Sequence, residues 1–190
     1  IGDNMFLDLY SKSKNIGIEF NGLRYHIDSK IRESNKKLAC VKHGITLITI
    51  FEDEWVLKQN IVKNILLEKF GMIKSVSLRP SFCDIRLISN TKEKIYLLDN
   101  YHIQGNRNSK INIAAYYKNE IIAVMSLDKP SRQNSGDFEI SRMCSNTKYR
   151  IHGIWSKLLK FAINEKLISG KIYSFSDNRF SEGKVYEKIG

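Results

Sequence analysis

The stretches Phe6-Leu-Asp-Leu-Tyr10 and Ile18-Glu-Phe-Asn-Gly-Leu-Arg-Tyr-His26 decide how the first part of the chain folds. Both are rich in apolar and aromatic residues, and the polar residues 11–15 separate them. Short β-prone runs on either side of a polar turn are typical of neighbouring strands. The sequence therefore predicts two short strands, over residues 5–10 and 16–20.

The side chains of these strands suggest a reactive site. Alternate residues of a strand point to opposite faces, so Glu19 and Asn21 share a face, and Asp8 approaches it if the strands pair. Two converging carboxylates are hard oxygen ligands suited to Mg²⁺. The imidazole of His26 has the pKa range needed for proton transfer near neutral pH. The alternative is that the two acids are solvated charges at strand ends and His26 is an ordinary loop histidine.

The rest of the first half alternates between helix and strand patterns. Residues 29–43 are polar with spaced apolar positions, which predicts an exposed helix ending at Gly44. Residues 45–51 (ITLITIF) form a continuous apolar run of strand length, typical of a central strand. A helix is predicted over residues 55–70, with Gly71 as its stop signal.

This order of motifs resembles the nuclease core of the very-short-patch-repair-like endonucleases, in particular the phage-encoded homing endonucleases, a branch of the PD-(D/E)XK fold. The resemblance covers residue 5 to about residue 70 and is most specific at Ile18–His26 and Gly44–Trp55. It implies an α/β nuclease core that hydrolyses phosphodiester bonds of double-stranded DNA with Mg²⁺ as cofactor.

The resemblance also implies roles for individual residues. Asp8 is the strand aspartate that binds Mg²⁺, and Glu19 stands where the general nuclease motif carries its second, metal-binding acid. His26 is the proton-transfer residue, and Glu33 is the assisting acid on the following helix. The lysine of the general motif is replaced by Asn21, as expected where histidine transfers the proton.

Three consecutive acids in Phe51-Glu-Asp-Glu-Trp55 invite a second metal-site interpretation. The favoured interpretation is structural: the strand ends here, Asp53 caps the next helix, and Glu54 lies favourably in its first turn. Trp55 is then expected in the core rather than stacked on a nucleic-acid base.

The second half predicts an α+β domain that begins near residue 76. Residues 118–120 separate two apolar runs in the pattern of a β-hairpin. The predicted elements are strands over 82–88, 111–117, 121–127, 138–144 and 172–175, and helices over 92–101 and 152–167.

This order resembles the acetyl-CoA-dependent N-acetyltransferase superfamily. Arg150-x-x-Gly153 lies where that family has its pyrophosphate-binding loop, which directs backbone N–H groups and a helix N-terminus at the diphosphate. The bulky Trp155 replaces the second small residue of that loop and should obstruct backbone approach. Tyr186 stands where the superfamily often has a general-acid tyrosine, although the same residues suit ordinary helix packing.

Composition narrows the class of protein. The chain of 190 residues carries 31 Lys+Arg against 20 Asp+Glu, a formal net charge of +11. A broad positive surface favours a polyanionic partner, although codon bias toward lysine could contribute part of the charge. The three cysteines are isolated in the sequence, at Cys40, Cys83 and Cys144. This spacing favours small buried apolar residues in a reducing compartment over zinc ligands or disulfides. No apolar run approaches membrane-spanning length, so we expect a soluble protein of the (host) cytoplasm.

The leading hypothesis is a homing-type, Mg²⁺-dependent DNA endonuclease, with a nuclease core over residues 1–75 and an acetyltransferase-like domain over residues 76–190. We expect the sequence to be a piece of a longer protein in which both domains are cut, the nuclease core after the first helix of its family and the second domain before its last strand. The alternatives are an acetyl-CoA-dependent transferase or DNA-modifying enzyme using the second domain, and a nuclease-derived DNA-binding protein that no longer cuts. The basic residues expected to contact DNA are Arg24, Arg107, Lys110, Arg132, Arg142, Lys148, Arg150 and Arg179.

Overall fold

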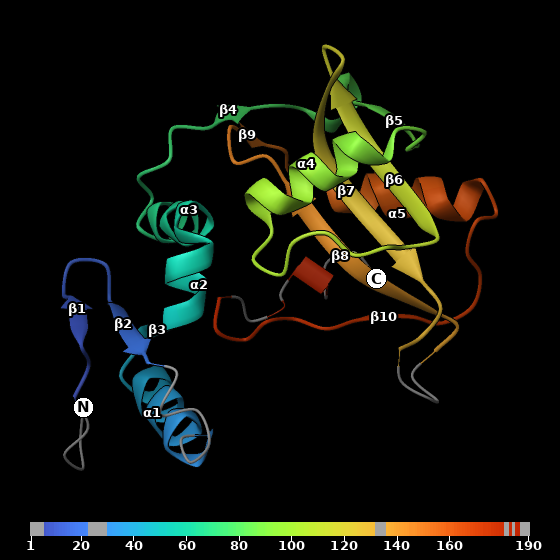
Figure 1. The fold of residues 1–190 in the computed structure, drawn as a ribbon. Coiled ribbons are helices and arrows are strands. Elements are labelled where there is room, and N and C mark those ends of the chain that lie inside the picture. The colour runs from blue at the N-terminus through green and yellow to red at the C-terminus, as the bar shows by residue number, and fades with distance from the viewer. Residues whose placement is uncertain (1–5, 23–29, 132–135, 181–182, 184, 187–190) are drawn as a thin grey trace. The chain divides into compact units, whose positions relative to one another are not determined.

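The computed structural model describes residues 6–22, 30–131, 136–180, 183 and 185–186, and it divides into two compact units (Figure 1). The first unit contains Ile1–Met72 together with Asp177–Ser181, and the second contains Ile73–Ser176 and Glu182–Gly190. The break after Met72 lies close to the expected boundary at residue 75. The inclusion of Asp177–Ser181 in the first unit was not expected from the sequence.

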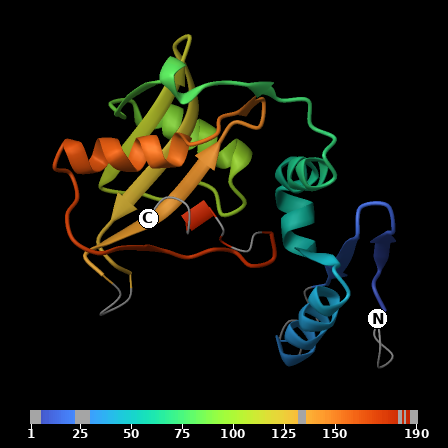
Figure 2. The ribbon, with the colours of Figure 1, turned by 180° about the vertical axis from the view of Figure 1, so that it is seen from behind.

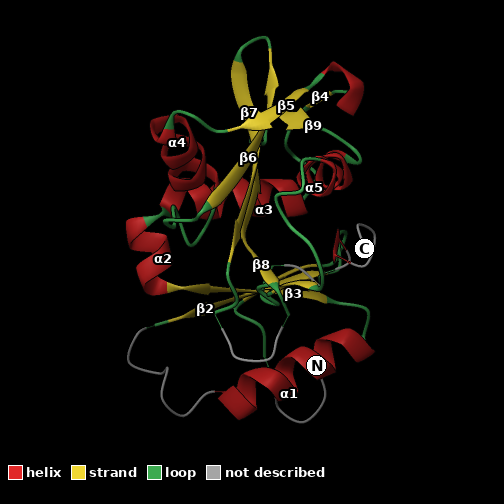
Figure 3. Cartoon of the chain, turned by 90° about the vertical axis from the view of Figure 1, so that its right-hand side faces the viewer, coloured by secondary structure: helices red, strands yellow, loops and turns green. Residues whose placement is uncertain are grey.

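The first unit is built on a three-stranded sheet with the order β1-β2-β3. Strand β1 (Leu9–Ser11) pairs antiparallel with β2 (Ile16–Asn21), as the two predicted strands require. Helix α1 (Lys30–Lys42) then leads to β3 (Thr46–Phe51), which pairs parallel with β2. Figure 3 shows α1 running alongside this small sheet. The connection by a helix is what a parallel pair needs.

Two helices follow β3 where the sequence predicted one. Helix α2 (Glu52–Leu57) and helix α3 (Gln59–Lys69) are separated at Lys58, whose φ of −134° interrupts the helical backbone. The predicted capping by Asp53 is wrong, because Phe51 is the N-cap and Glu54 closes the capping box by accepting from its backbone N–H at 3.3 Å. The helix therefore begins before Asp53, in a turn where three acids favour the positive end of the helix.

The second unit contains a five-stranded sheet with the order β10-β8-β7-β6-β5. The pairs are antiparallel except for β10 with β8, which run parallel. At the hairpin between β6 and β7, Lys118 and Asn119 both have positive φ, of 49° and 65°, as a type I′ turn requires. The strands are β5 (Asp84–Leu87), β6 (Ile111–Tyr117), β7 (Glu120–Asp128), β8 (Phe138–Ser145) and β10 (Ile172–Ser174).

Two helices cover opposite faces of this sheet. Helix α4 (Thr91–Tyr101) lies in front of it in Figure 1, and helix α5 (Ile154–Asn164) lies in front in the reverse view of Figure 2. Leu97 and Leu98 pack with one set of strand residues, and Ile154 and Leu158 pack with the alternate set. Within the described part of the chain, no helix is long and apolar enough to cross a membrane.

A two-residue parallel ladder precedes the main sheet of the second unit. Strand β4 (Val76–Ser77) pairs with β9 (Tyr149–Arg150), and a short 3₁₀ helix, Pro80–Phe82, follows it. The backbone N–H of Leu78 continues the ladder by donating to the carbonyl of Arg150 at 3.0 Å. This segment therefore lies against the loop that leads into α5.

The three cysteines are free and buried, as the sequence predicts. Cys40, Cys83 and Cys144 have exposed fractions of 0%, 4% and 5%. Burial raises the pKa of each thiol, and it raises the pKa of Cys144 to about 12. They are packing residues, because a reactive thiol needs an accessible and stabilised thiolate.

Candidate functional site

The hairpin of β1 and β2 brings Asp8 and Glu19 together. The backbone N–H of Asp8 donates to Glu19 Oε1 at 3.2 Å, and Asp8 Oδ2 accepts from the backbone N–H of Phe20 at 2.8 Å. Each carboxylate thus reaches across to the other's strand. This reciprocal arrangement follows from the pairing of Leu9 with Ile18, which places the two acids beside each other.

Helix α1 supplies a cation to this pair. Lys36 Nζ donates to Glu19 Oε2 at 2.5 Å, and the two side chains are 13% and 10% exposed. Burying these two polar groups is tolerated because each provides the partner that the other needs. The site therefore combines two carboxylates with one ammonium group.

A second polar contact joins α1 to the same face of β2. Asn21 Nδ2 donates to Glu33 Oε1 at 2.7 Å. Glu19 and Asn21 are two residues apart on β2 and share one face of the strand, as predicted. Glu33 and Lys36 are three residues apart on α1 and share one face of the helix. Of the predicted site residues, the structure joins Asp8 to Glu19, and it places Glu33 against Asn21, two residues along β2 from Glu19.

Lys36 is the residue of this cluster that sequence reasoning missed. It lies in a polar helix with several lysines, and nothing in its local sequence sets it apart. Its spacing from Glu33 is the signal that could have found it, because a residue three positions after a site acid faces the same way.

The donor chemistry of the two carboxylates suits Mg²⁺ unequally. Asp8 is exposed, and no hydrogen bond from the described residues reaches its Oδ1, so this oxygen can serve a hard cation. Glu19 is buried and both its oxygens already accept hydrogen bonds. Among the described residues, no group of three His, Cys, Asp or Glu side chains has the geometry of a metal site. Asp8 fits the expected cation, whereas Glu19 would first have to exchange Lys36 for it.

His26 and Arg24 lie outside the described residues, and so does Arg132. Proton transfer by His26 and DNA contacts by the two arginines therefore stay predictions from the sequence.

Arg179 was expected to contact DNA, and in the structure its guanidinium is held within the first unit. Its Nη1 and Nη2 each donate to a different oxygen of Glu54 at 2.8 Å, and Nη2 also donates to Asp177 Oδ2 at 2.6 Å. Such forked pairing uses most of the donors of the group. A DNA contact by Arg179 would have to compete with these two carboxylates.

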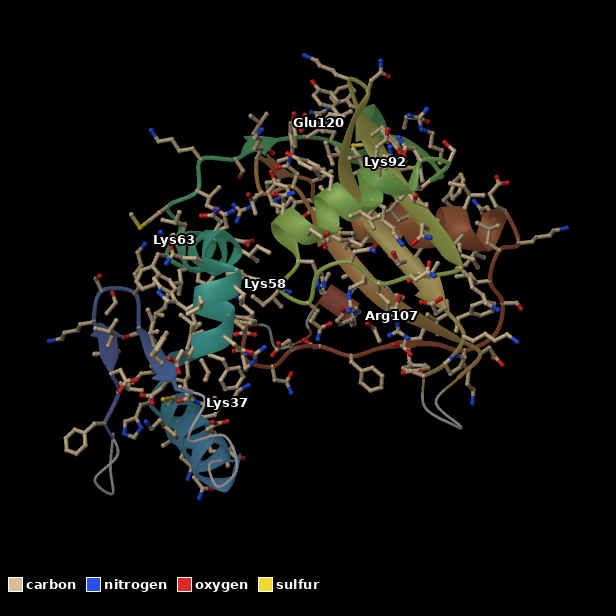
Figure 4. All side chains as sticks on the ribbon, viewed as in Figure 1. Lys37, Lys58, Lys63, Lys92, Arg107 and Glu120 are labelled. Carbon is tan, nitrogen blue, oxygen red and sulfur yellow. The ribbon has the colours of Figure 1, made fainter. Side chains whose placement is uncertain are left out.

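The other basic residues expected to contact DNA differ in how far their side chains are held by contacts within the protein. Arg107, labelled in Figure 4, has Nη1 at 3.4 Å from Glu139 Oε1, and Arg142 donates to the carbonyls of Gly105 and Ser141. The remaining described residues of this set are exposed and suit a polyanion without rearrangement: Lys110, Lys148 and Arg150.

The loop before α5 has one feature of the expected pyrophosphate-binding site. Gly153 is the N-cap of α5 and has a φ of +81°, a left-handed conformation that favours glycine. Trp155 is half-buried and packs against the apolar core of the second unit. The Trp155 ring therefore packs against the core, whereas from the sequence we expected its bulk to obstruct the approach of the backbone to a diphosphate.

The β4 segment lies close to that helix start. Lys157 Nζ donates to the carbonyls of Pro80 and Cys83 at 2.7 and 2.8 Å, and a Cβ added at Gly153 would lie 3.9 Å from Pro80 Cγ. A diphosphate at these N–H groups would share the space with Pro80. Near the end of the described chain, the backbone N–H of Tyr186 donates to the carbonyl of Gly183 at 2.9 Å, and its predicted acid role stays a prediction.

No protein-family model matches the sequence, and no curated protein matches it. Two solved structures are similar to this chain, both of an aminoglycoside acetyltransferase from an uncultured soil metagenomic sample. The complex with trehalose has 17% sequence identity and a TM-score of 0.42, and covers 57% of this chain and 88% of that chain. The complex with sisomicin has 14% identity and a TM-score of 0.40, and covers 57% and 86%. Each of these matches covers little more than half of this chain.

Proposed function

We propose that this protein is a Mg²⁺-dependent DNA endonuclease whose reactive site lies in the first unit. The observation that carries the proposal is the contact between Asp8 and Glu19 across the β1–β2 hairpin, with Lys36 of α1 paired to Glu19 at 2.5 Å. Phosphodiester hydrolysis needs groups that hold a cation and groups that stabilise negative charge on the phosphoryl oxygens. The cluster offers both kinds of group.

Asp8 would hold the cation, because its carboxylate is exposed and one oxygen accepts no hydrogen bond from the described residues. Mg²⁺ in proteins is commonly bound by one or two carboxylates and several waters, so a single free carboxylate oxygen is a sufficient start. When bound, the ion would polarise the phosphoryl oxygen and lower the pKa of a water. Glu19 would orient Asp8 through the backbone N–H that it accepts.

Lys36 would contribute positive charge beside the scissile phosphate. In a site shielded from water, a fixed ammonium group stabilises developing negative charge more strongly than it does in bulk solvent. Proton transfer is expected from His26, on the resemblance described for the sequence. The net charge of +11 and the exposed Lys110, Lys148 and Arg150 support a polyanionic substrate.

Cleavage of supercoiled plasmid or phage DNA tests this function. Mg²⁺ should support nicking or linearisation, EDTA should abolish it, and DNA retardation in a gel should persist in EDTA. Binding without cleavage would instead favour a nuclease-derived DNA-binding protein. A wild-type protein that neither cleaves nor binds DNA would contradict the proposed function.

The second candidate is acetyl transfer by the second unit. The favouring observation is that β10 pairs in parallel with only Phe138–Ile140 of β8, while the left-handed Gly153 starts α5. Among the described residues, no strand pairs with the rest of β8 on that edge, and the N-terminus of α5 could hold a diphosphate. The contacts of Lys157 with Pro80 and Cys83 count against it, because they occupy the approach.

Calorimetry with acetyl-CoA distinguishes the candidates. Binding that is lost in Gly153→Trp, and kept in Gly71→Trp, would favour the transferase. Gly71 also has positive φ, of +70°, but belongs to the first unit, so it matches the backbone strain of the test variant. Absence of heat from both the wild type and the control would exclude it.

A further inference from the structure

Four residues near the end of the described chain belong to the first unit, although about a hundred residues of the second unit separate them from it in sequence. We call residues 177–180 the C-terminal strap. The strap begins just after β10, and its own backbone turns at Asp177, whose carbonyl accepts from the N–H of Phe180 at 3.1 Å.

Arg179 fastens the strap to the end of β3 and the start of α2. Its guanidinium donates to both oxygens of Glu54 at 2.8 Å and lies 4.5 Å from the centroid of the Phe51 ring. The same Glu54 carboxylate accepts from the backbone N–H of Phe51. Glu54 and Arg179 are only 15% and 24% exposed, so the pair is mostly shielded from solvent. Shielded, forked arginine pairs hold geometry more firmly than surface pairs do.

Asp177 completes the arrangement of the guanidinium. It accepts from Arg179 Nε at 3.0 Å and from Nη2 at 2.6 Å. Although burial alone would lower the pKa of Arg179, its hydrogen bonds to Asp177 and Glu54 raise it. The guanidinium is thus fixed between one carboxylate of the strap and one of α2.

The strap also contacts helix α1. Lys37 Nζ, labelled on α1 in Figure 4, donates to the carbonyl of Asn178 at 2.5 Å. Lys37 directly follows Lys36, the residue that pairs with Glu19. On the β3 side, Phe51 lies opposite Asn21 in the parallel register, and Asn21 donates to Glu33 of α1.

We propose that Arg179 is a positioning residue: it fixes the strap so that α1 holds Lys36 at Glu19 and Glu33 at Asn21. The importance of this for cleavage rests on the proposed endonuclease function. Arg179 contacts none of the described residues Asp8, Glu19 and Lys36, and it acts through Glu54 and Phe51 on one side and through the Lys37 contact of the strap on the other. The first unit is then discontinuous in sequence, because residues 73–176 of the second unit lie between Met72 and the strap.

Hydrogen–deuterium exchange without DNA or Mg²⁺ tests the positioning directly. In Arg179→Ala, amide exchange should become at least about 10-fold faster in α1 and at the end of β3, since a shielded charge pair is lost. Exchange in β6 and β7 should stay unchanged. Arg86→Ala is the matched control, because Arg86 is an exposed arginine of the second unit paired with Asp84 at 3.7 Å. Unchanged exchange in α1 of Arg179→Ala would overturn the proposal, whether or not the protein cleaves DNA.

Cleavage adds the functional readout. Arg179→Ala should lower the cleavage rate at least about 10-fold and raise the Mg²⁺ concentration for half-maximal cleavage, while Arg179→Lys, which keeps the charge but loses the fork, should recover part of both. If Arg179→Ala is not folded, Glu54→Gln loosens the same contact with less disruption and should show the same direction. If the wild-type protein does not cleave DNA, only the endonuclease function is contradicted. Amide exchange in Arg179→Ala still tests whether the strap positions α1. Wild-type rates and Mg²⁺ dependence in Arg179→Ala would overturn its role in the reaction.

Discussion

The two units differ in the size of their apolar cores. The sheet of the second unit has runs of fully buried apolar residues, such as Ile122–Met125 on β7, and helices cover both its faces. The sheet of the first unit buries Glu19 beside Lys36 on one face, while Leu9 and Phe20 are 63% and 47% exposed. The second unit therefore has the larger apolar core, and we call it the apolar unit. The first, which we call the polar unit, buries fewer apolar residues, among them Ile48, Ile50 and Val62, and joins its sheet to α1 through charged contacts.

This difference teaches where to look for chemistry. A nearly buried ion pair stabilises a fold less than well-packed apolar groups of the same size would. Its presence at the point where β1, β2 and α1 meet is better explained by a role for the charges themselves. The second unit also buries two charged side chains: Lys94 Nζ donates to the carbonyl of Arg107, and Glu139 accepts from the backbone N–H of Ser131 and from the hydroxyl of Tyr173.

The largest expected stability effect is in the apolar unit. Leu158 of α5 is fully buried in the core, so Leu158→Ala should lower the free energy of unfolding of the second unit by about 2–5 kcal/mol. Urea unfolding followed by tryptophan and tyrosine fluorescence measures it, with the exposed Ile163→Ala on the same helix as control. A loss as small as that of the control would mean that the core is not what holds this unit.

The corresponding change in the polar unit is Lys36→Ala. It leaves the Glu19 carboxylate buried without its cation, so the first unit should lose about 3 kcal/mol of unfolding free energy. Lys63→Ala is the control, because Lys63 is exposed, and its Nζ donates to Gln59 Oε1 at 2.8 Å and lies 5.8 Å from the centroid of the Trp55 ring. Glu19→Gln should be milder than Lys36→Ala, and the reverse order would break the comparison of the units.

A smaller effect is expected at a polar group of the apolar unit. Tyr116 donates its hydroxyl to Glu93 at 2.7 Å, and burial first, then this bond, raises the pKa of Tyr116 to about 12. Tyr116→Phe should cost about 1 kcal/mol. Because the folded pKa is raised, the stabilisation is complete below the usual pKa of 10.0 and is lost as the pH rises toward 12. Unfolding free energies at pH 8 and pH 11 check this, and an equal difference between wild type and variant at both pH values would contradict it.

The smallest expected effect is acid dependence of the strap. Burial favours the neutral form of Asp177 and would raise its pKa. Hydrogen bonds from Arg179, together with the positive charges of Arg179 and Lys37, outweigh burial and lower the pKa of Asp177 below 3.8. A carboxylate whose pKa is lower in the folded state stabilises the fold at pH values above its usual pKa. This stabilisation is lost as the pH falls through the folded-state pKa. Below about pH 4 the first unit should therefore weaken in wild type more than in Asp177→Asn. Parallel losses in the two proteins would exclude a contribution from Asp177.

Much of the second unit could be predicted because its pattern is apolar. The runs at 111–117 and 121–127 differ from β6 and β7 by a residue at most at each end, and the predicted helix at 92–101 is α4. Burial fixes these elements, and burial is what periodicity reports. In the first unit the break at Lys58 was missed, since it is a backbone feature without a glycine or proline to mark it.

The candidate site was predictable only in part. Asp8 and Glu19 meet because alternation and a hairpin require it, which short-range reasoning can supply. The pairing of Lys36 with Glu19 and of Arg179 with Glu54 was not predicted, because these partners lie 17 and 125 residues apart and no local pattern encodes such pairs. Long-range charge pairing is therefore where the structure adds most to the sequence.

The most direct measurement is the plasmid cleavage rate with saturating Mg²⁺ in Asp8→Asn beside Asp84→Asn. Both changes neutralise one exposed carboxylate, the first in the polar unit and the second in the apolar unit. If the first unit holds the reactive site, Asp8→Asn should lose about 100-fold or more in rate with DNA binding kept, and Asp84→Asn should cleave like wild type. Equal rates in the two variants would contradict the assignment of the site to Asp8, Glu19 and Lys36.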